Sequence, residues 1–422
     1  MTDPAWIDAT LAGARPQAIA ALLRYFRDLD AAEEAFQDAC LRALRNWPDK
    51  GPPRDPTAWL ILVGRNAAID ASRRQSRYRP LPPEDLLSDL EDAETDLAER
   101  LDGSHYRDDV LRLLFICCHP DLPATQQIAL ALRVISGLSV KQIARAFLVS
   151  ETAMEQRITR AKARVAGGGA AFEAPGPVER AERLAAVAAM IYLVFNEGYS
   201  AGGAAVAARG PFCAEASRLA RLLLRLVPAE PEVMGLAALM LLQHARAPAR
   251  FDANGAAILL DDQDRSLWQK RMISEGLALI DKAMWRRRPG PYQVQAAIAA
   301  LHARAARPED TDWVEIDQLY ATLERMQPSP VVTLNRAVAV AKVQGAAVAL
   351  AMIAPLESRL NGYFHFHGAR GAFLAQMGRT DEARTAFDRA IALAGTAAEA
   401  AHIRQYLDRL EREAGVETSG AY

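Results

Sequence analysis

Hydrophobic residues recur at helical spacing along most of the chain, and this pattern predicts an all-α protein. Over residues 31–47 they follow one another at intervals of three and four, which is the stripe of an amphipathic helix. Residues 48–56 hold four prolines and are expected to form a loop. A second helix is expected over residues 57–77, apolar at its start and basic at its end. Five further helices are expected over residues 184–195, 232–246, 268–285, 292–306 and 313–326.

A pair of short helices is expected over residues 138–165. Ser139 and Gln142 form a capping-box pattern for the first helix, Ser150 can cap the second, and a short turn at Leu148 separates them. The inner face is apolar, and the outer face is expected to carry Arg157, Arg160, Lys162 and Arg164. A helix pair with a basic outer face suits entry into the major groove of DNA. An ordinary amphipathic pair with a solvated charged face would give the same pattern.

Composition divides the chain into five parts. Its 422 residues exceed what a single hydrophobic core usually serves. Residues 81–104 carry nine acidic residues against one arginine, and they are expected to form an acidic linker. Glycines and prolines predict a flexible joint over residues 167–177. The expected parts are a helical domain over 1–80, the linker over 81–104, a helical domain over 105–166, the joint over 167–177 and a helical domain over 178–415.

The sequence gives little support to a secreted, membrane or metal-binding protein. The N-terminal residues lack the pattern of a signal peptide. The longest apolar run, residues 184–195, is shorter than the roughly 18 residues that a membrane span requires. Cys117, Cys118 and His119 stand together, but no second pair has ligand spacing, so we expect a buried helix end there. We therefore expect a cytoplasmic protein with no membrane partner, no metal and no cofactor.

Three segments, in this order, resemble the extracytoplasmic-function (ECF) group of bacterial sigma factors. They are the helix that contains residues 32–38, the helix that contains residues 58–74, and the helix pair over 138–165. The resemblance covers about residues 10–166. It implies a transcription initiation factor without catalytic activity, with core RNA polymerase and promoter DNA as its partners. In this family the linker corresponds to a region that threads toward the polymerase active-site channel.

The resemblance also implies roles for individual residues. The helix over 31–47 would bind the polymerase, the following loop and helix would melt the −10 element and hold its exposed strand, and the helix after Ser150 would read the −35 element. Trp59 could stack on a base, but its apolar neighbours favour a place in the core. The candidates are Gln37, Asp38 and Arg42 for the polymerase, Asn66, Asp70, Arg73, Arg74 and Arg77 for the −10 element, and Glu155, Gln156, Arg157, Arg160 and Lys162 for the −35 element.

Glu155 departs from the family pattern, because many members carry a basic residue at this position. A carboxylate near base edges can accept a hydrogen bond from cytosine N4, which would change the promoter preference. Alternatively, Glu155 contacts Thr159 or solvent, and Gln156 and Arg157 read the DNA.

The tail distinguishes this chain from a minimal ECF factor, which would end near residue 170. A period of about 33 residues relates the segments that start near Ala337 and Arg370. The second copy matches the small and large residues of a tetratricopeptide (TPR) repeat at Gly371, Gly378, Ala383, Phe387 and Ala390. We expect a TPR-like regulatory domain that docks on the first two domains and binds an effector or partner protein.

Three polar segments of the tail, residues 196–200, 250–255 and 260–268, are left without a role. Asp252 and Asn254 are oxygen ligands of the kind that calcium prefers, but the spacing of an EF-hand is missing. Structural alternatives for the third segment are capping by Asp264 or Ser266 and a local ion pair of Arg265.

Two other functions stay open on the sequence alone. One is a free-standing DNA-binding regulator with a TPR-like sensor domain, which would leave the first domain without a task. The other is an enzyme whose site is the loop of residues 261–265. No nucleophile–base pair, phosphate loop or metal cluster supports it, so we do not expect an enzyme.

Overall fold

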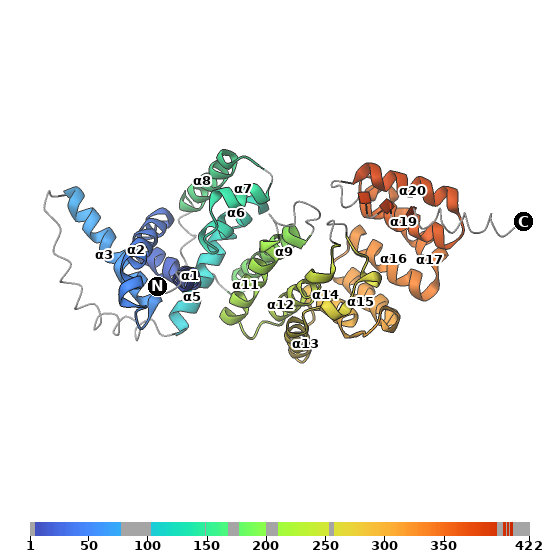
Figure 1. Cartoon of the computed structure of the whole chain (residues 1–422), viewed down its shortest axis with the longest axis horizontal. Coiled ribbons are helices and arrows are strands. Elements are labelled where there is room, and N and C mark those ends of the chain that lie inside the picture. The colour runs from blue at the N-terminus through green and yellow to red at the C-terminus, as the bar shows by residue number, and fades with distance from the viewer. Residues whose placement is uncertain are drawn as a thin grey trace, which may run out of the picture. The chain divides into compact units, whose positions relative to one another are not determined.

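The computed structural model describes residues 5–76, 103–147, 149–167, 177–199, 210–252 and 257–394, together with six positions between 400 and 407. Within these residues the secondary structure is helical, apart from one isolated bridge between Phe251 and Ala257 (Figure 1). The all-α prediction is therefore confirmed. The chain divides into two compact units, Met1–Val194 and Phe195–Tyr422.

The first unit begins with three long helices, α1 (Ala5–Phe26), α2 (Leu29–Lys50) and α3 (Pro56–Ser76), each of which packs against the other two. The side chain of Asp28 caps α2 by accepting a hydrogen bond from the backbone N–H of Ala31 at 2.8 Å. Gly64 lets α3 approach α2 closely, because a Cβ there would lie 2.8 Å from the carbonyl oxygen of Ala35.

The expected loop over residues 48–56 is too long. Helix α2 continues through Pro48 to Lys50, and the non-helical connection is limited to residues 51–55. Pro48 removes one N–H donor, but the backbone N–H of Gly51 still closes the last turn on the carbonyl of Trp47 at 2.9 Å. Gly51 ends the helix with a φ of +79°, a conformation that favours glycine.

Four helices follow in the first unit: α5 (Gly103–Cys117), α6 (Ala124–Val134), α7 (Val140–Ala146) and α8 (Glu151–Gly167). The predicted capping box is confirmed, since Gln142 donates its backbone N–H to Ser139 Oγ and accepts from the Ser139 N–H. Ser150 caps α8 by accepting from the N–H of Ala153 at 3.2 Å. Helices α7 and α8 pack on each other and on α6, as a helix-turn-helix requires. Cys117 and Cys118 are buried, and burial raises the pKa of both thiols.

Helix α9 (Pro177–Tyr199) crosses the boundary between the units, and the second unit is helical throughout its described residues. Four of the five helices expected in the tail are confirmed to within two residues at each end, while α9 extends well beyond the expected 184–195. The second unit contains α11 (Pro211–Leu226), α12 (Pro231–His244), α13 (Lys270–Met284), α14 (Pro291–Arg304), α15 (Trp313–Met326), α16 (Pro330–Gln344), α17 (Ala346–Ile353), α18 (Glu357–Leu360), α19 (Phe364–Gln376) and α20 (Thr380–Leu393).

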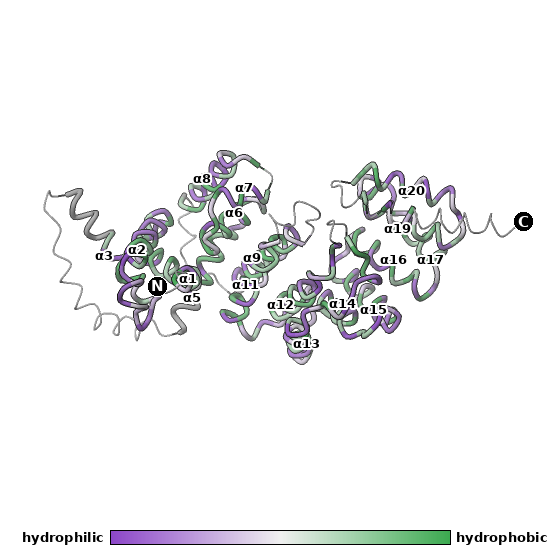
Figure 2. Tube along the Cα trace, in the orientation of Figure 1, coloured by the Kyte–Doolittle hydropathy of each residue, from purple (hydrophilic) through white to green (hydrophobic). Residues whose placement is uncertain are grey.

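Successive helices of the second unit pack as neighbours, and the last pair, α19 and α20, shows the small-and-large packing expected from the repeat. A Cβ on Gly371 would lie 2.6 Å from the ring of Phe387, so only glycine lets this aromatic side chain pack against α19. Gly378 makes the turn between the two helices with a φ of +71°. Figure 2 shows hydrophobic and hydrophilic positions alternating along these helices, the pattern on which their prediction rests.

Candidate polymerase and DNA interface

The face of α2 that points to solvent combines charged residues with exposed leucines. Gln37 and Asp38 are exposed, and Arg42 is half-buried beside them. Leu41 and Leu44 keep 54% and 46% of their surface exposed although the opposite side of the same helix is buried. Sequence analysis missed the two leucines, whose signal is that the apolar stripe of α2 is wider than its core requires. A helix face of this composition suits a protein partner, because exposed apolar residues gain most when a partner covers them.

Helix α3 carries the candidates for the −10 element. Asn66 is exposed, and the neighbouring Arg65 places its guanidinium 4.8 Å from the ring centre of Tyr25, which is itself half exposed. An exposed aromatic ring beside an arginine is the kind of platform on which an unpaired base stacks. Sequence analysis missed Tyr25, because it lies on α1 and meets α3 only in the fold.

The other −10 candidates lie where the structure describes little. Asp70, Arg73 and Arg74 belong to α3, but their side chains lie outside the described residues, as does Arg77 altogether. Trp59 is half-buried and packs edge-on against Trp47 with ring centres 5.3 Å apart, which agrees with the expected place at the edge of the core.

The first half of α8 presents the candidates for the −35 element. Glu155, Gln156 and Arg160 are exposed, and Arg157 is half-buried. Lys162 contradicts the expectation that it lies on the outer face. Its side chain keeps only 18% of its surface exposed, and its Nζ lies 2.6 Å from carboxylate oxygens of both Asp30 and Glu33 on α2. Sequence periodicity within α8 could not reveal this contact, because its partners lie about 130 residues earlier in the chain.

Glu33 is the centre of an ion cluster that joins the two halves of the first unit. Its side chain is only 5% exposed, and it meets cations from three helices. The ion pairs join it to Arg15 of α1 at 3.1 Å, to Lys162 of α8 at 2.6 Å and to Arg133 of α6 at 3.9 Å. We call Arg15, Glu33, Arg133 and Lys162 the Glu33 cluster. Since a buried carboxylate requires such partners, the cluster holds α2 against the helix-turn-helix.

Arg15 strengthens this joint through the backbone. Its Nε donates to the carbonyl of Val134 at 2.8 Å, and its Nη2 donates to the carbonyl of Arg133 at 3.2 Å, both at the C-terminal end of α6. Burial lowers the pKa of Arg15, and the charge of Glu33 opposes this shift. For Lys162, burial also lowers the pKa, but hydrogen bonds to Asp30 and Glu33 outweigh it and raise the value above the ordinary one.

Comparison with known proteins identifies the two halves of the first unit. The family model for sigma-70 region 2 matches residues 12–78, which contain α2 and α3. The model for sigma-70 region 4 matches residues 112–165, which contain the helix-turn-helix. The chain belongs to the sigma-70 family. It is an ECF-like sigma-70 factor with a C-terminal extension, and regions 2 and 4 give it the DNA-binding role of the family in transcription initiation.

The extension is matched separately, and a relative spans the whole chain. Residues 183–284 match a model described as a family of unknown function, DUF6596. An uncharacterized protein of Rhizobium meliloti (strain 1021) is 71% identical over 413 residues, which cover 98% of each chain. The extension therefore occurs together with regions 2 and 4 in that relative as well.

The described residues contain no helix that is long and apolar enough to cross a membrane. Nor do they bring together three or more histidine, cysteine, aspartate or glutamate side chains at distances that suit a metal ion.

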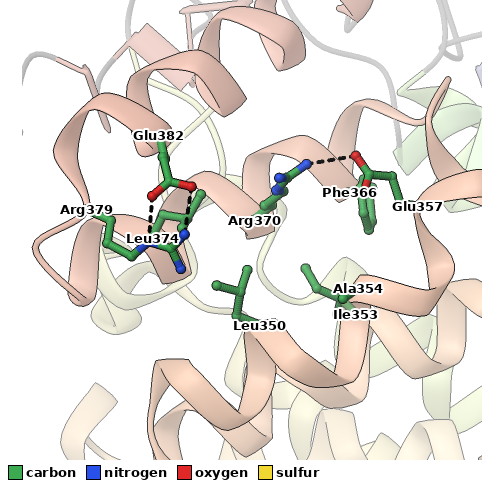
Figure 3. Close-up of a pocket in the computed structure, with 9 residues that line it drawn as sticks. All are labelled: Leu350, Ile353, Ala354, Glu357, Phe366, Arg370, Leu374, Arg379 and Glu382. Carbon is green, nitrogen blue, oxygen red and sulfur yellow. Dashed lines mark hydrogen bonds and ion pairs between the residues drawn. The ribbon is translucent and has the colours of Figure 1, made fainter.

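A pocket of about 210 Å³ lies in the extension between α17, α19 and α20 (Figure 3). Its apolar lining includes Leu350, Phe366 and Leu374. Its two arginines are already paired, Arg370 with Glu357 at 2.9 Å and Arg379 with Glu382 at 2.7 Å. The lining residues therefore offer no unpaired charge to a ligand.

Proposed function

We propose that this sigma factor binds core RNA polymerase through α2 and directs it to promoters with −10 and −35 elements. The observation that carries the proposal is the solvent face of α2, where Leu41 and Leu44 are exposed beside Gln37, Asp38 and Arg42 within the region 2 match. The polymerase would cover these leucines, and α3 would hold the −10 strand through Asn66, Asp70, Arg73, Arg74 and Arg77.

In this proposal α8 enters the major groove at the −35 element. Gln156 and Arg157 contact base edges, and Arg160 contacts phosphates. Glu155 is exposed on the same turn, where its carboxylate would favour a cytosine over the bases that present only acceptors. Lys162 reaches the DNA backbone only after it leaves Asp30 and Glu33, because those ion pairs hold its Nζ against α2.

Regions 2 and 4 must separate before both elements are bound. Elements centred at −10 and −35 lie about 25 base pairs apart, which is roughly 85 Å of DNA at about 3.4 Å per base pair. Helices α2 and α8 are in direct contact through Lys162, so the packed arrangement cannot span that distance. Residues 77–102, which join the two regions, reach at most roughly 90 Å when fully extended. We propose that the free chain is closed by the Glu33 cluster and that polymerase binding opens it.

The arginines at the end of α3 provide a test of the −10 assignment. Replacing Arg73 and Arg74 with alanine should weaken open-complex formation, because an exposed strand needs cations along its backbone. The loss of two phosphate contacts should also lower the slope of log affinity against log salt by about 1.4. Heparin-resistant open complexes, measured over a range of salt, would check both effects.

A matched control for this test is Arg384→Ala with Arg389→Ala, which removes two exposed arginines from α20. Open complexes that form equally well with both double variants would mean that Arg73 and Arg74 only stabilise the C-terminal end of α3.

We propose further that the extension is a TPR-like regulatory domain that docks on regions 2 and 4 and responds to an effector or partner protein. The helical hairpins at its C-terminal end, such as α19 with α20, support a repeat architecture.

Truncation after Gly169 tests this regulatory role. Promoter output in run-off transcription should change by about fivefold or more, since couplings between sites of one protein usually have that size. A chain that lacks only residues 408–422 is the control. Unchanged output and unchanged polymerase affinity after removal of the whole extension would contradict a regulatory role.

A further inference from the structure

The three tail segments that had no expected role meet in one place in the second unit. Tyr199 comes from the first segment, Arg250 from the second, and Arg265 and Trp268 from the third. Arg246, which follows α12, completes the group. We call Tyr199, Arg246, Arg250, Arg265 and Trp268 the arginine–aromatic cluster. All five lie within the residues that match the family of unknown function.

Two aromatic rings hold the three arginines together. The guanidinium of Arg250 lies 3.5 Å from the ring centre of Tyr199, whose hydroxyl accepts a hydrogen bond from Arg246. Arg246 and Arg265 share the ring of Trp268, at 5.9 Å and 4.9 Å from its centre. Stacking on aromatic rings keeps guanidinium groups in place while it leaves their N–H donors free for another partner.

The cluster lacks the carboxylates that would normally accompany three cations. Within the described part of the chain, no ion pair joins Arg246, Arg250 or Arg265 to an acid. The acids nearest to Arg265 have other partners: Asp261 pairs with Lys342, and Glu309 and Asp310 pair with Arg307. The contrast with the pocket of Figure 3, where each arginine has its own glutamate, is direct.

The charges at the cluster repel one another. Burial lowers the pKa of Arg250, and the neighbouring Arg246 lowers it further. Burial lowers the pKa of His302 to about 4, and both Arg246 and Arg265 contribute to this shift. His244 is affected in the same direction by burial, Arg221 and Arg250. A concentration of positive charge that is costly to the free protein is favourable for an anion.

Several donors of the cluster are buried and have no partner in the described structure. They are Nε of Arg246, Nε and Nη2 of Arg265, and Nε1 of Trp268. Arg265 has one structural task, since its Nη1 donates to the carbonyls of His302 and Ala305 at the end of α14. This bond contradicts the expected local ion pair of Arg265, and it leaves the rest of the guanidinium unexplained. Buried donors without partners are rare in native proteins and call for a missing ligand or water.

We propose that the arginine–aromatic cluster binds a small anionic ligand that carries a phosphate or carboxylate group. Guanidinium groups bind both groups through paired, charge-assisted hydrogen bonds. A small ligand fits better than a nucleic acid strand, because the three arginines are half-buried and gathered at one point instead of lining a groove. The inference goes beyond the proposed sigma-factor role and gives the extension a ligand class.

Isothermal titration of the full chain with pyrophosphate and with citrate, at matched ionic strength in chloride, tests the proposal. The wild-type chain should bind at least one of the two, and which of them it prefers separates phosphate from carboxylate recognition. Arg246→Gln and Arg250→Gln should each weaken the affinity about tenfold or more. The matched control is Arg218→Gln on α11, because Arg218 is already paired with Glu215. Failure of both probes to bind, or equal affinity in all three variants, would overturn the proposal.

The titration of His302 gives a second readout that needs no variant. Because Arg246 and Arg265 lower its pKa, an anion bound between them should raise that pKa above the value of about 4 in the free chain. NMR titration with and without the bound probe would measure the shift, and an unchanged pKa would place the anion elsewhere. Neither experiment uses polymerase or DNA, so a negative result would leave the sigma-factor role untouched.

Discussion

Replacing Leu41 and Leu44 with glutamate should abolish binding of the chain to core RNA polymerase without unfolding it. Covering a leucine at an interface contributes about 1.5–3 kcal/mol, so losing two of them weakens binding at least about 100-fold. Two new carboxylates in a covered surface would weaken it further. Both side chains are about half exposed in the free chain, so the fold does not depend on them. Pull-down or surface plasmon resonance with purified core polymerase would measure the loss.

The control for this prediction is Val348→Glu on α17, which places a carboxylate at a similarly exposed apolar position of the extension. Circular dichroism should give all these chains the same helical content. If the Leu41 and Leu44 variant binds as tightly as the control, α2 is not the surface that the polymerase recognises.

Replacing Glu33 with glutamine should destabilise the free chain and, at the same time, tighten its binding to the polymerase. The amide keeps the shape of the side chain but removes the charge that Arg15, Arg133 and Lys162 share. Loss of one charged partner from such hydrogen bonds costs about 2 kcal/mol of the free energy of unfolding. The same change favours the open chain, and apparent affinity rises with the fraction of molecules that are competent to bind. We expect a gain of up to about tenfold.

Urea denaturation and polymerase binding would measure these opposite effects, and Glu34→Gln is the matched control. Glu34 is the exposed neighbour of Glu33 on the same helix, so its replacement should change neither quantity. A Glu33 variant that is less stable and also binds more weakly would contradict the proposal that the cluster must open. The Glu33 cluster would then be needed in the bound state.

Local sequence patterns predicted the helices and their caps because the interactions that form them lie within a few residues. The Ser139 capping box, the Ser150 cap and the turn at Gly378 are of this kind. Helix α11 could have been found in the same way, since its buried positions repeat at helical spacing from Phe212 to Leu223. Pro48 misled the analysis, because a proline in the last turn does not end a helix whose next carbonyl finds another donor.

Contacts between distant parts of the chain were beyond the reach of the sequence. Lys162 was placed toward solvent because the pattern within α8 treats every basic residue alike, and its partner Asp30 lies 132 residues away. Glu33 carried no signal at all, since one acid on an amphipathic helix usually faces water. The polar segments of the tail were noticed singly, but only the fold shows that Tyr199, Arg250 and Trp268 share one site.

Run-off transcription with purified core RNA polymerase, on DNA from upstream of the chain's own gene, tests the central claim most directly. The account predicts a specific transcript when the wild-type chain is added, and none with polymerase alone or with the Leu41 and Leu44 variant. DNA binding by the chain without any transcript that depends on it would contradict the account. The protein would then act as a free-standing DNA-binding regulator, and the exposed face of α2 would serve a different partner.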